Sequence, residues 1–391
     1  MTDALADAAR LRDLLKGWAL GTAYPLWWTV GADPRTGAGA GGFFETLDQS
    51  GQAQDSPRRG RVLPRQIYAF AAARDLGWNG PWRQAVDHGL SYYLDVYRRP
   101  DGLFRALVGP GGVCLDDTAA LYDQAFALFA LANACAVTGV NELRAVAVSV
   151  RDTLLATLKT PLGGFNESTP TDPPLHSNPH MHLFEACLAW NQIDPDPVWR
   201  ALADEIAQLA LTRFIDPKTG ALREFFAADW TPAPGVAGRI WEPGHQYEWG
   251  WLLLRWGQLA ARPDATAAAL RMIDLAETAG CDAERGVAIN ALLDDMSAHD
   301  AGARLWPQTE RIKAGALAAE ITGDPRWWGV AVEGAEGLLQ YLRTPVPGLW
   351  RDKLKPDGSF VEEAAPASSF YHIVCAIAEL DRVVTAQTAE L

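Results

Sequence analysis

The sequence lacks the features that would place it in a membrane or an oxidising compartment. Its five cysteines are odd in number, scattered, and include no Cys-x-x-Cys pair, which argues against a disulfide framework or a structural zinc site. The most apolar stretch, residues 125–137, is too short to cross a bilayer and predicts a buried helix. Residues 1–20 read as a charged amphipathic helix rather than a signal peptide. We therefore expect a soluble, cytoplasmic protein.

Positive charge is also scarce. Lysine and arginine number 34 against 48 aspartates and glutamates, which gives a net charge of −14. Nucleic acids and anionic membranes select basic surfaces, so neither is an expected partner. The same imbalance argues weakly against a phosphorylated substrate. No Ser/Gly-rich or charged linker interrupts the chain, and we predict a single domain over residues 1–391.

A glycine-marked turn recurs six times in the chain. The steps between successive glycines are 60, 62, 56, 66 and 62 residues, which leaves room for two helices and a short hairpin in each unit. Six such units predict an all-α fold, an (α/α)6 barrel of twelve helices with short β-hairpins at one end. The six glycines are Gly42, Gly102, Gly164, Gly220, Gly286 and Gly348.

The apolar periodicity predicts a helix at the N-terminus and eleven more along the chain. Residues 121, 125, 128, 129 and 132, for example, have the spacing of one buried helical stripe. The predicted ranges are 65–77, 81–98, 120–138, 141–159, 180–192, 197–213, 244–261, 264–280, 306–322, 325–342 and 369–385.

The first helix after each glycine turn opens with polar or aromatic residues, about 18 to 25 residues beyond its glycine. Because these openings are in phase, we expect them at one end of the ring, facing a shared central cavity. The openings are Arg65 with Tyr68, Tyr122 with Asp123 and Gln124, His182 with Glu185, His245 with Glu248, Trp306 with Gln308 and Glu310, and Tyr371 with His372.

Two openings share the pattern His-x-x-Glu, His182 with Glu185 and His245 with Glu248. Residues three apart lie on one helical face, so each carboxylate can hold its imidazole or a substrate hydroxyl. The positive end of the helix dipole is expected to lower the histidine pKa and keep the ring neutral. The chain also has 16 tryptophans, several beside these polar positions, and aromatic faces beside hydrogen-bonding groups suit a sugar.

These motifs resemble the N-acylglucosamine 2-epimerase superfamily over essentially the full chain, most closely its mannose isomerase-like members. The resemblance rests on six segments in order. They are Arg65-Gln-Ile-Tyr68-Ala-Phe70, Leu121-Tyr122-Asp123-Gln124-Ala-Phe126, Asn178-Pro179-His180-Met181-His182-Leu-Phe-Glu185, Pro243-Gly244-His245-Gln-Tyr-Glu248-Trp249, Arg304-Leu-Trp306-Pro307-Gln308-Thr-Glu310 and Tyr371-His372-Ile373.

The resemblance implies His245 and His372 as the catalytic acid/base pair. It implies substrate contacts from Arg65, which would meet the enediolate oxygens, and from His182, near C1 and O5 of the sugar. Further substrate-binding residues are Tyr122, Trp306, Asn178 and Arg239. The carboxylates of Glu185, Glu248, Asp123 and Glu310 are interpreted as supports for these groups.

No cofactor is expected. A metal is not expected either, because His-x-x-Glu differs from His-Glu-x-x-His and the sequence has no compact set of ligands. The favoured function is a sugar isomerase that interconverts a free aldose and ketose of the mannose/fructose type through a cis-enediolate. A 2-epimerase acting on glucose/mannose, cellobiose or N-acylglucosamine is the closest alternative.

Three further possibilities stay open: a phosphosugar isomerase, a glycoside hydrolase using Asp123 and Glu310, and a non-catalytic sugar-binding barrel. The expected partner is a mono- or disaccharide, and a homodimer is compatible with the sequence.

Overall fold

The structure is a computed structural model that describes residues 3–171 and 173–389. Its contacts divide the chain into two compact units. The first unit takes Met1–Gly21, Ala210–Glu363 and His372–Leu391, and the second takes Thr22–Leu209 and Ala364–Tyr371. The prediction of a single domain stays a prediction.

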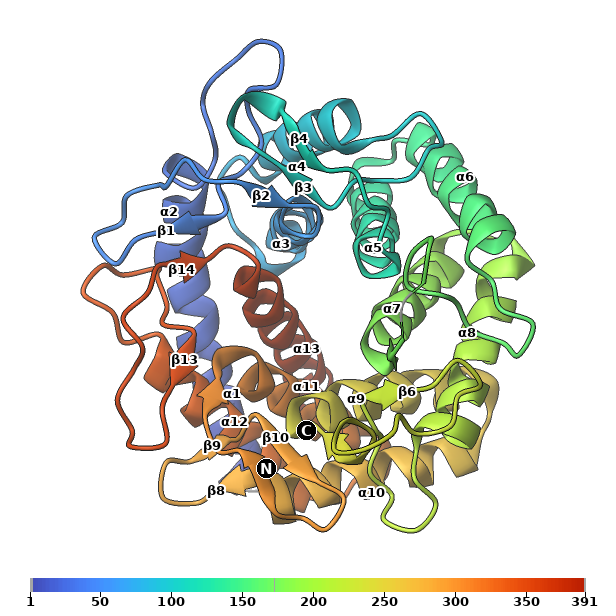
Figure 1. The fold of residues 1–391 in the computed structure, drawn as a ribbon. Coiled ribbons are helices and arrows are strands. Elements are labelled where there is room, and N and C mark those ends of the chain that lie inside the picture. The colour runs from blue at the N-terminus through green and yellow to red at the C-terminus, as the bar shows by residue number, and fades with distance from the viewer. Residues whose placement is uncertain (1–2, 172, 390–391) are drawn as a thin grey trace. The chain divides into compact units, whose positions relative to one another are not determined.

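The second unit contains three successive helical hairpins. Helices α3, α5 and α7 pack against one another in series, and each packs against the helix that follows it in the chain (Figure 1). The helices are α2 (Tyr24–Thr29), α3 (Val62–Leu76), α4 (Trp82–Tyr92), α5 (Leu121–Thr138), α6 (Glu142–Thr157), α7 (Ser177–Ile193) and α8 (Pro197–Leu209).

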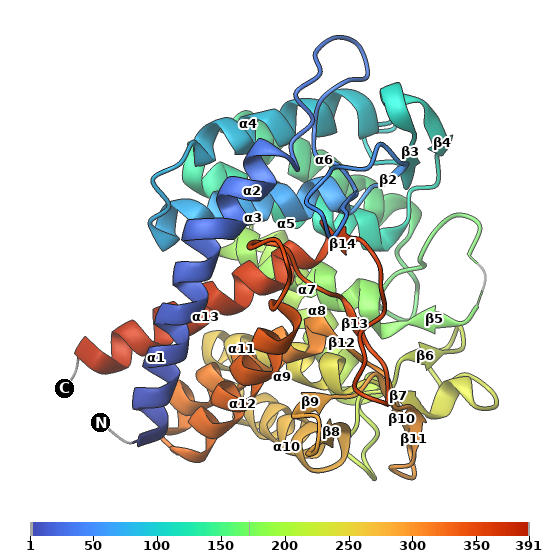
Figure 2. The ribbon, with the colours of Figure 1, turned by 90° about the vertical axis from the view of Figure 1, so that its left-hand side faces the viewer.

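The first unit repeats this arrangement with α9 against α10, α11 against α12, and α9 against α11. The N-terminal helix α1 packs on α12 (Figure 2). The helices are α1 (Asp3–Trp18), α9 (Pro243–Ala260), α10 (Pro263–Gly280), α11 (Leu305–Thr322) and α12 (Arg326–Tyr341). Helix α13 (Ser369–Ala389) begins in the second unit and continues in the first.

Burial separates the two kinds of helix. Helix α8 is buried along one stripe that includes Trp199, Leu202, Ala203 and Ile206, as expected for an amphipathic helix with one solvent face. Helix α5 is buried nearly all round. Its 18 residues are long and apolar enough to cross a membrane by composition, but 72% of them are buried within the protein, as in a core helix. The prediction of a buried helix here is confirmed, although the apolar helix is longer than the predicted stretch.

Short antiparallel strands accompany the hairpins. In the second unit β1 (Thr46–Leu47) pairs with β14 (Ala365–Pro366), and β3 (Leu107–Val108) lies between β2 (Arg58–Arg59) and β4 (Cys114–Asp116). In the first unit β10 (Ala291–Leu293) lies between β7 (Ile240–Trp241) and β11 (Ala298–Asp300). Also in this unit, β8 (Cys281–Asp282) pairs with β9 (Val287–Ala288), and β12 (Ala303–Arg304) with β13 (Lys353–Leu354). Two further strands are β5 (Leu175–His176) and β6 (Phe225–Phe226).

All six predicted turn glycines have positive φ angles, between 67° and 93°. This left-handed region is costly for residues with a Cβ atom, so the recurrence of glycine has a backbone cause. The prediction that these glycines make structural turns is therefore confirmed.

Three glutamines join these turns to the helices that follow. The Oε1 atom of Gln124, Gln246 or Gln308 accepts from a backbone N–H two residues beyond the turn glycine, and its Nε2 atom donates to the carbonyl of that same residue. We call this pair of bonds the glutamine clamp. All six bonds are between 2.7 and 3.0 Å, and the clamped residues are Phe104, Leu222 and Ala288. The clamp fixes each hairpin relative to the first turn of its helix, where the candidate site residues lie.

Candidate active site

Within the first unit, three helices bring two imidazoles to the same indole. His245 lies in the first turn of α9, which begins at Pro243, and Trp306 lies in the first turn of α11. The ring centres of His245 and Trp306 are 5.0 Å apart, and those of Trp306 and His372, from α13, are 5.7 Å apart. Both imidazoles are buried, with 6% and 5% of their surface exposed. The two predicted catalytic residues therefore flank a predicted substrate-binding residue.

His245 is surrounded by carboxylates. Its Nδ1–H donates to Oε2 of Glu224 over 2.8 Å, and an oxygen of Glu242 is 3.7 Å from the same nitrogen. Burial acts to lower the pKa of His245, but the charges of Glu224, Glu242 and Glu248 outweigh it and raise the pKa to about 10. The expectation of a lowered pKa and a neutral His245 is wrong, because these charges exceed any effect of the helix dipole.

His372 has a different pair of neighbours. Its Nδ1–H donates to Oε1 of Glu310 over 2.8 Å. The other oxygen of Glu310 is 2.6 Å from Nζ of Lys313, one turn further along α11. Neither side chain of this Glu310–Lys313 pair is exposed. Because a carboxylate can only accept, the contact with Glu310 fixes the proton on Nδ1 and puts the lone pair of a neutral ring on Nε2.

Glu248 was predicted to support His245 directly, but the hydrogen-bond partner of that imidazole is Glu224. Glu248 contributes to the His245 pKa through its charge. It also lies in a group with Glu310 and His372 whose candidate ligand atoms are all within 4.8 Å of one another. The carboxylate is therefore shared between the surroundings of the two histidines.

Two groups in the first unit have the composition of a metal site: Glu224 with Glu242 and His245, and Glu248 with Glu310 and His372. In both, however, the histidine Nδ1 already donates to a carboxylate, and in the second Lys313 contacts Glu310 as well. A cation would have to displace these contacts. The donor sets therefore fit a divalent ion poorly as they stand.

In the second unit, Arg65 on α3 is held among aromatic rings. Its guanidinium lies 4.2 Å from the ring centre of Phe126 and 5.4 Å from that of Tyr371. It donates to the Tyr122 hydroxyl over 2.7 Å and to the Ser368 carbonyl over 3.3 Å. Arg65 is 6% exposed, so these contacts, and not bulk water, hold its guanidinium in place.

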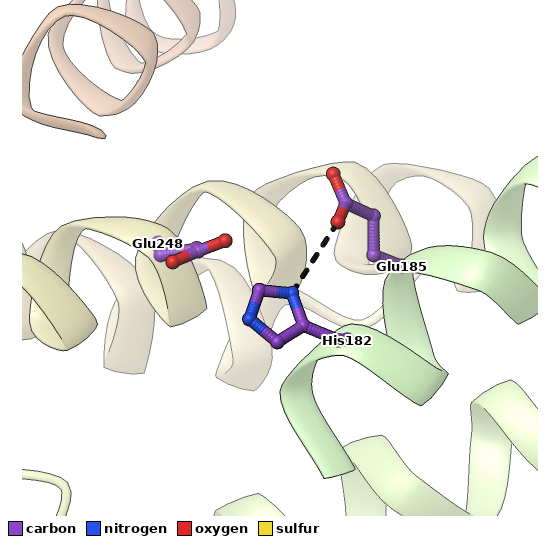
Figure 3. A group of neighbouring side chains, drawn as sticks. All are labelled: His182, Glu185 and Glu248. Atoms are coloured by element: carbon purple, nitrogen blue, oxygen red, sulfur yellow. Dashed lines mark ion pairs between the residues drawn. The ribbon is translucent and has the colours of Figure 1, made fainter. Parts of the chain in front are cut away.

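His182 on α7 lies beside the same aromatic group. Its ring centre is 4.3 Å from that of Phe126 and 5.1 Å from that of Tyr122. Its Nδ1 is 3.7 Å from Oε2 of Glu185, three residues along the helix, as the His-x-x-Glu spacing predicted (Figure 3). The Tyr371 hydroxyl donates to the same Glu185 oxygen over 2.5 Å. The second unit thus gathers Arg65, Tyr122, His182 and Glu185 into one cluster.

Two other predicted residues of the second unit have buried polar atoms. Burial raises the pKa of Asp123 to about 6 despite the opposing charges of Arg61 and Arg65, and the Arg61 contact is 3.6 Å long. The Asn178 side-chain oxygen, near the start of α7, is buried and accepts no hydrogen bond within the described residues. An unsatisfied buried acceptor suits a substrate hydroxyl.

Arg239 has a different environment from that of the other predicted site residues. It ends a short 3₁₀ helix, is 40% exposed, and forms ion pairs of 2.8 Å with Asp294 and Asp295. Within the described residues, the ion pairs of Arg239 do not reach His245. The neighbouring histidine of α7, His180, accepts from the Phe165 N–H and contacts the His176 carbonyl.

Sequence reasoning missed Glu224 and Lys313. Glu224 lies four residues after the turn glycine Gly220, and Glu167, three after Gly164, likewise contacts the histidine His176. A carboxylate at this point of the turn was therefore an available signal. Lys313 had a signal in the i,i+3 spacing from Glu310, but a lysine on an apolar helix is ordinarily solvent-facing.

The comparisons with known proteins identify the family. The N-acylglucosamine 2-epimerase (GlcNAc 2-epimerase) family model matches residues 42–376. The chain belongs to this family. It is 49% identical over 374 residues to a mannose-6-phosphate isomerase of Rhizobium meliloti, covering 94% of this chain and 96% of that protein. It is also 29% identical to a D-mannose isomerase of Thermobifida fusca, over 69% and 71% of the two chains.

Solved structures of this family superpose on nearly the whole chain. Cellobiose 2-epimerase from Spirochaeta thermophila gives a TM-score of 0.87 at 22% identity, covering 99% of this chain and all of that one. A D-mannose isomerase gives 0.85 at 21% identity, over 94% and 97%. The predicted all-α (α/α)6 fold class is confirmed by these neighbours. The family member described here is a sugar isomerase or epimerase.

Proposed function

We propose that this protein interconverts a free aldose of mannose configuration and the corresponding ketose, mannose and fructose being the model pair. The names of two relatives support a sugar of mannose configuration, and the D-mannose isomerase supports the free sugar. The single observation that carries the chemistry is the pair of buried imidazoles beside Trp306, each with its own carboxylate.

The reaction requires a proton to leave C2 of the open-chain aldose and to arrive at C1. One imidazole removes the C2 proton while the other donates to O1, which gives the enediol. The O2 proton then leaves, C1 is protonated, and the ketose is formed with both imidazoles back in their starting states. A base and an acid of different proton affinity are needed together. His245, protonated because of its carboxylates, is suited to the acid role.

The remaining roles in this proposal belong to Arg65, Tyr122, Asn178 and His182 of the second unit and to Trp306 of the first. Arg65 would stabilise the developing negative charge on the enediolate oxygens, and His182 would polarise the substrate near C1 and O5. Tyr122 and Trp306 would form walls against the sugar ring, and the unsatisfied oxygen of Asn178 would accept from a hydroxyl. That all these residues meet one bound sugar is a prediction.

A 2-epimerase is the second candidate, because the family model and the cellobiose 2-epimerase neighbour carry that activity in their descriptions. Epimerisation returns the proton to the opposite face of C2 instead of to C1. Incubation with mannose in D2O, with products resolved by chromatography and NMR, separates the two. Fructose carrying deuterium at C1 supports the isomerase. Glucose carrying deuterium at C2, with no fructose, shows that the protein is an epimerase instead.

A phosphorylated substrate is favoured by the name of the 49% identical relative. Against it, four carboxylates lie around the two histidines of the first unit and Lys313 is already paired. We expect kcat/KM for mannose to exceed that for mannose 6-phosphate at matched ionic strength. The opposite ranking would assign the phosphosugar as the substrate.

Glycoside hydrolysis is the least favoured activity. Hydrolysis requires a carboxylic acid and a carboxylate beside one glycosidic bond, and it would leave the two imidazoles beside Trp306 without a role. A GH76 alpha-mannanase from Bacteroides thetaiotaomicron is a structural neighbour with a TM-score of 0.64 at 12% identity, a likeness of fold alone. A cytoplasmic location, the absence of a cofactor and a possible homodimer stay predictions.

A further inference from the structure

Lys313 is an unusual residue for the interior of a helical protein. Neither it nor its partner Glu310 has an exposed side chain, and the Nζ to Oε2 distance is 2.6 Å. Its ammonium also lies 3.8 Å from the ring centre of Trp251. A buried lysine is unfavourable unless its charge is matched, and here a carboxylate and an aromatic face match it.

The carboxylate that matches Lys313 is the same one that holds His372. Glu310 gives one oxygen to Lys313 and the other to Nδ1 of His372, so the three groups form a line from the lysine to the imidazole. The charged groups placed beside His372 by the contacts of the first unit are Glu310 and Lys313 from α11 and Glu248 from α9.

The two candidate catalytic histidines therefore have unequal electrostatic surroundings. His245 is surrounded by Glu224, Glu242 and Glu248, and these carboxylates are the charges that act most strongly on its proton affinity. For His372, a buried ammonium offsets the carboxylate that holds the ring. An acid and a base can be told apart when their surroundings push their proton affinities in different directions.

We propose that Lys313 is a positioning residue of the isomerase: it orients Glu310, and its positive charge offsets that of the carboxylate, so that His372 presents an unprotonated Nε2 and acts as the base at the sugar carbon. This inference rests on the proposed function and goes beyond it by adding a residue that acts through Glu310 without touching substrate. Without the ammonium, the Glu310–His372 pair as a whole binds a proton more readily, whichever member carries it.

The test is the pH dependence of kcat/KM for Lys313→Gln, Lys313→Met and Lys313→Arg. Gln keeps a polar N–H group but no charge, Met keeps neither, and Arg keeps both. We expect the acidic limb of the profile to move upward by about one to two pH units in the Gln and Met variants and to stay near wild type in Arg. The matched control is Lys353→Met, which removes a half-exposed lysine from a 2.8 Å pair with Glu363 and should leave the limb in place.

An acidic limb that does not move in Lys313→Gln would overturn the proposal and leave Lys313 a structural residue. Because Lys313→Met risks unfolding, the Gln variant decides the matter if Met is not recovered. Titration of His372 by NMR with 15N-labelled histidine, assigned through His372→Asn, provides a readout independent of turnover. If the wild-type protein isomerises no sugar, the proposed function fails, whereas an upward shift of this titration in Lys313→Gln still supports the electrostatic role of Lys313.

Discussion

The substitution Glu224→Gln removes the carboxylate that contacts His245 while keeping nearly the same shape. The pKa of His245 lies at about 10 against an ordinary 6.5, a difference that corresponds to about 5 kcal/mol between its two protonation states. Glu224 is the largest of the charges that oppose desolvation, and its Oε2 atom is also the hydrogen-bond acceptor. We therefore expect its loss to lower the pKa of His245 by about two units or more.

The consequence for activity depends on pH in a defined direction. If protonated His245 is the acid, the alkaline limb of kcat/KM falls from near pH 10 to about pH 8 or below in Glu224→Gln. At pH 9 this change in protonation alone lowers kcat/KM by about 10-fold to 100-fold, while near pH 6 the two proteins differ much less. The assay is initial-rate fructose formation from mannose between pH 5 and 10.5.

The stability of the fold also depends on the protonation of His245, and it falls as the pH rises. The folded-state pKa of His245 is raised, so its charged form stabilises the fold fully below about pH 6.5, and this contribution is lost as the pH rises through about 10. Urea unfolding should therefore show a loss of stability between these values that is smaller in Glu224→Gln. The control is Glu167→Gln, which alters another turn carboxylate that contacts a histidine, His176. An alkaline limb that stays within about half a pH unit of wild type would refute the reasoning.

Three further predictions concern the helix interfaces and the metal question. In Gly244→Ala the new Cβ would meet the Trp306 ring at 2.4 Å, so we expect the indole to shift and KM for mannose to rise several-fold, with circular dichroism and Tm checking that the fold is kept. In Gly315→Ala the Cβ would meet the backbone nitrogen of Ala331 at 2.6 Å, so α11 and α12 must separate; we expect a loss of about 1–3 kcal/mol in urea unfolding, and an unchanged midpoint would contradict the close packing. Dialysis against EDTA should leave kcat unchanged, because the two candidate ligand groups of the first unit are already internally paired; a loss restored by one divalent ion would reverse this view.

The helical framework was largely predictable from local signals. The predicted ranges 120–138 and 306–322 correspond to α5 and α11 within one residue at each end, because apolar periodicity and capping residues are encoded in consecutive positions. The short helix α2, Tyr24–Thr29, was missed, since six residues are too few to display a period. The helix from 81 was predicted too long as an α-helix, because its last turn, Tyr93–Tyr97, is a π-helix.

The sequence predicted which residues form the site better than it predicted their protonation states. In-phase helix openings selected His245, Trp306 and His372, which the structure brings together within the first unit. The protonation of His245 could not be read from its own helix, because the deciding carboxylate comes from 21 residues earlier in the chain. Glu224 and Lys313 act through tertiary contacts, which periodicity does not report.

The glutamine clamp has an evolutionary consequence. Each glutamine side chain bonds only to the backbone N–H and carbonyl of one hairpin residue, so the clamp does not depend on the side chains of that hairpin. New loop sequences could be exchanged there while the backbone stays anchored at Leu222 or its counterparts. Hairpins of different sequence on the same helices offer a route by which related enzymes could acquire different sugar preferences without changes to their cores.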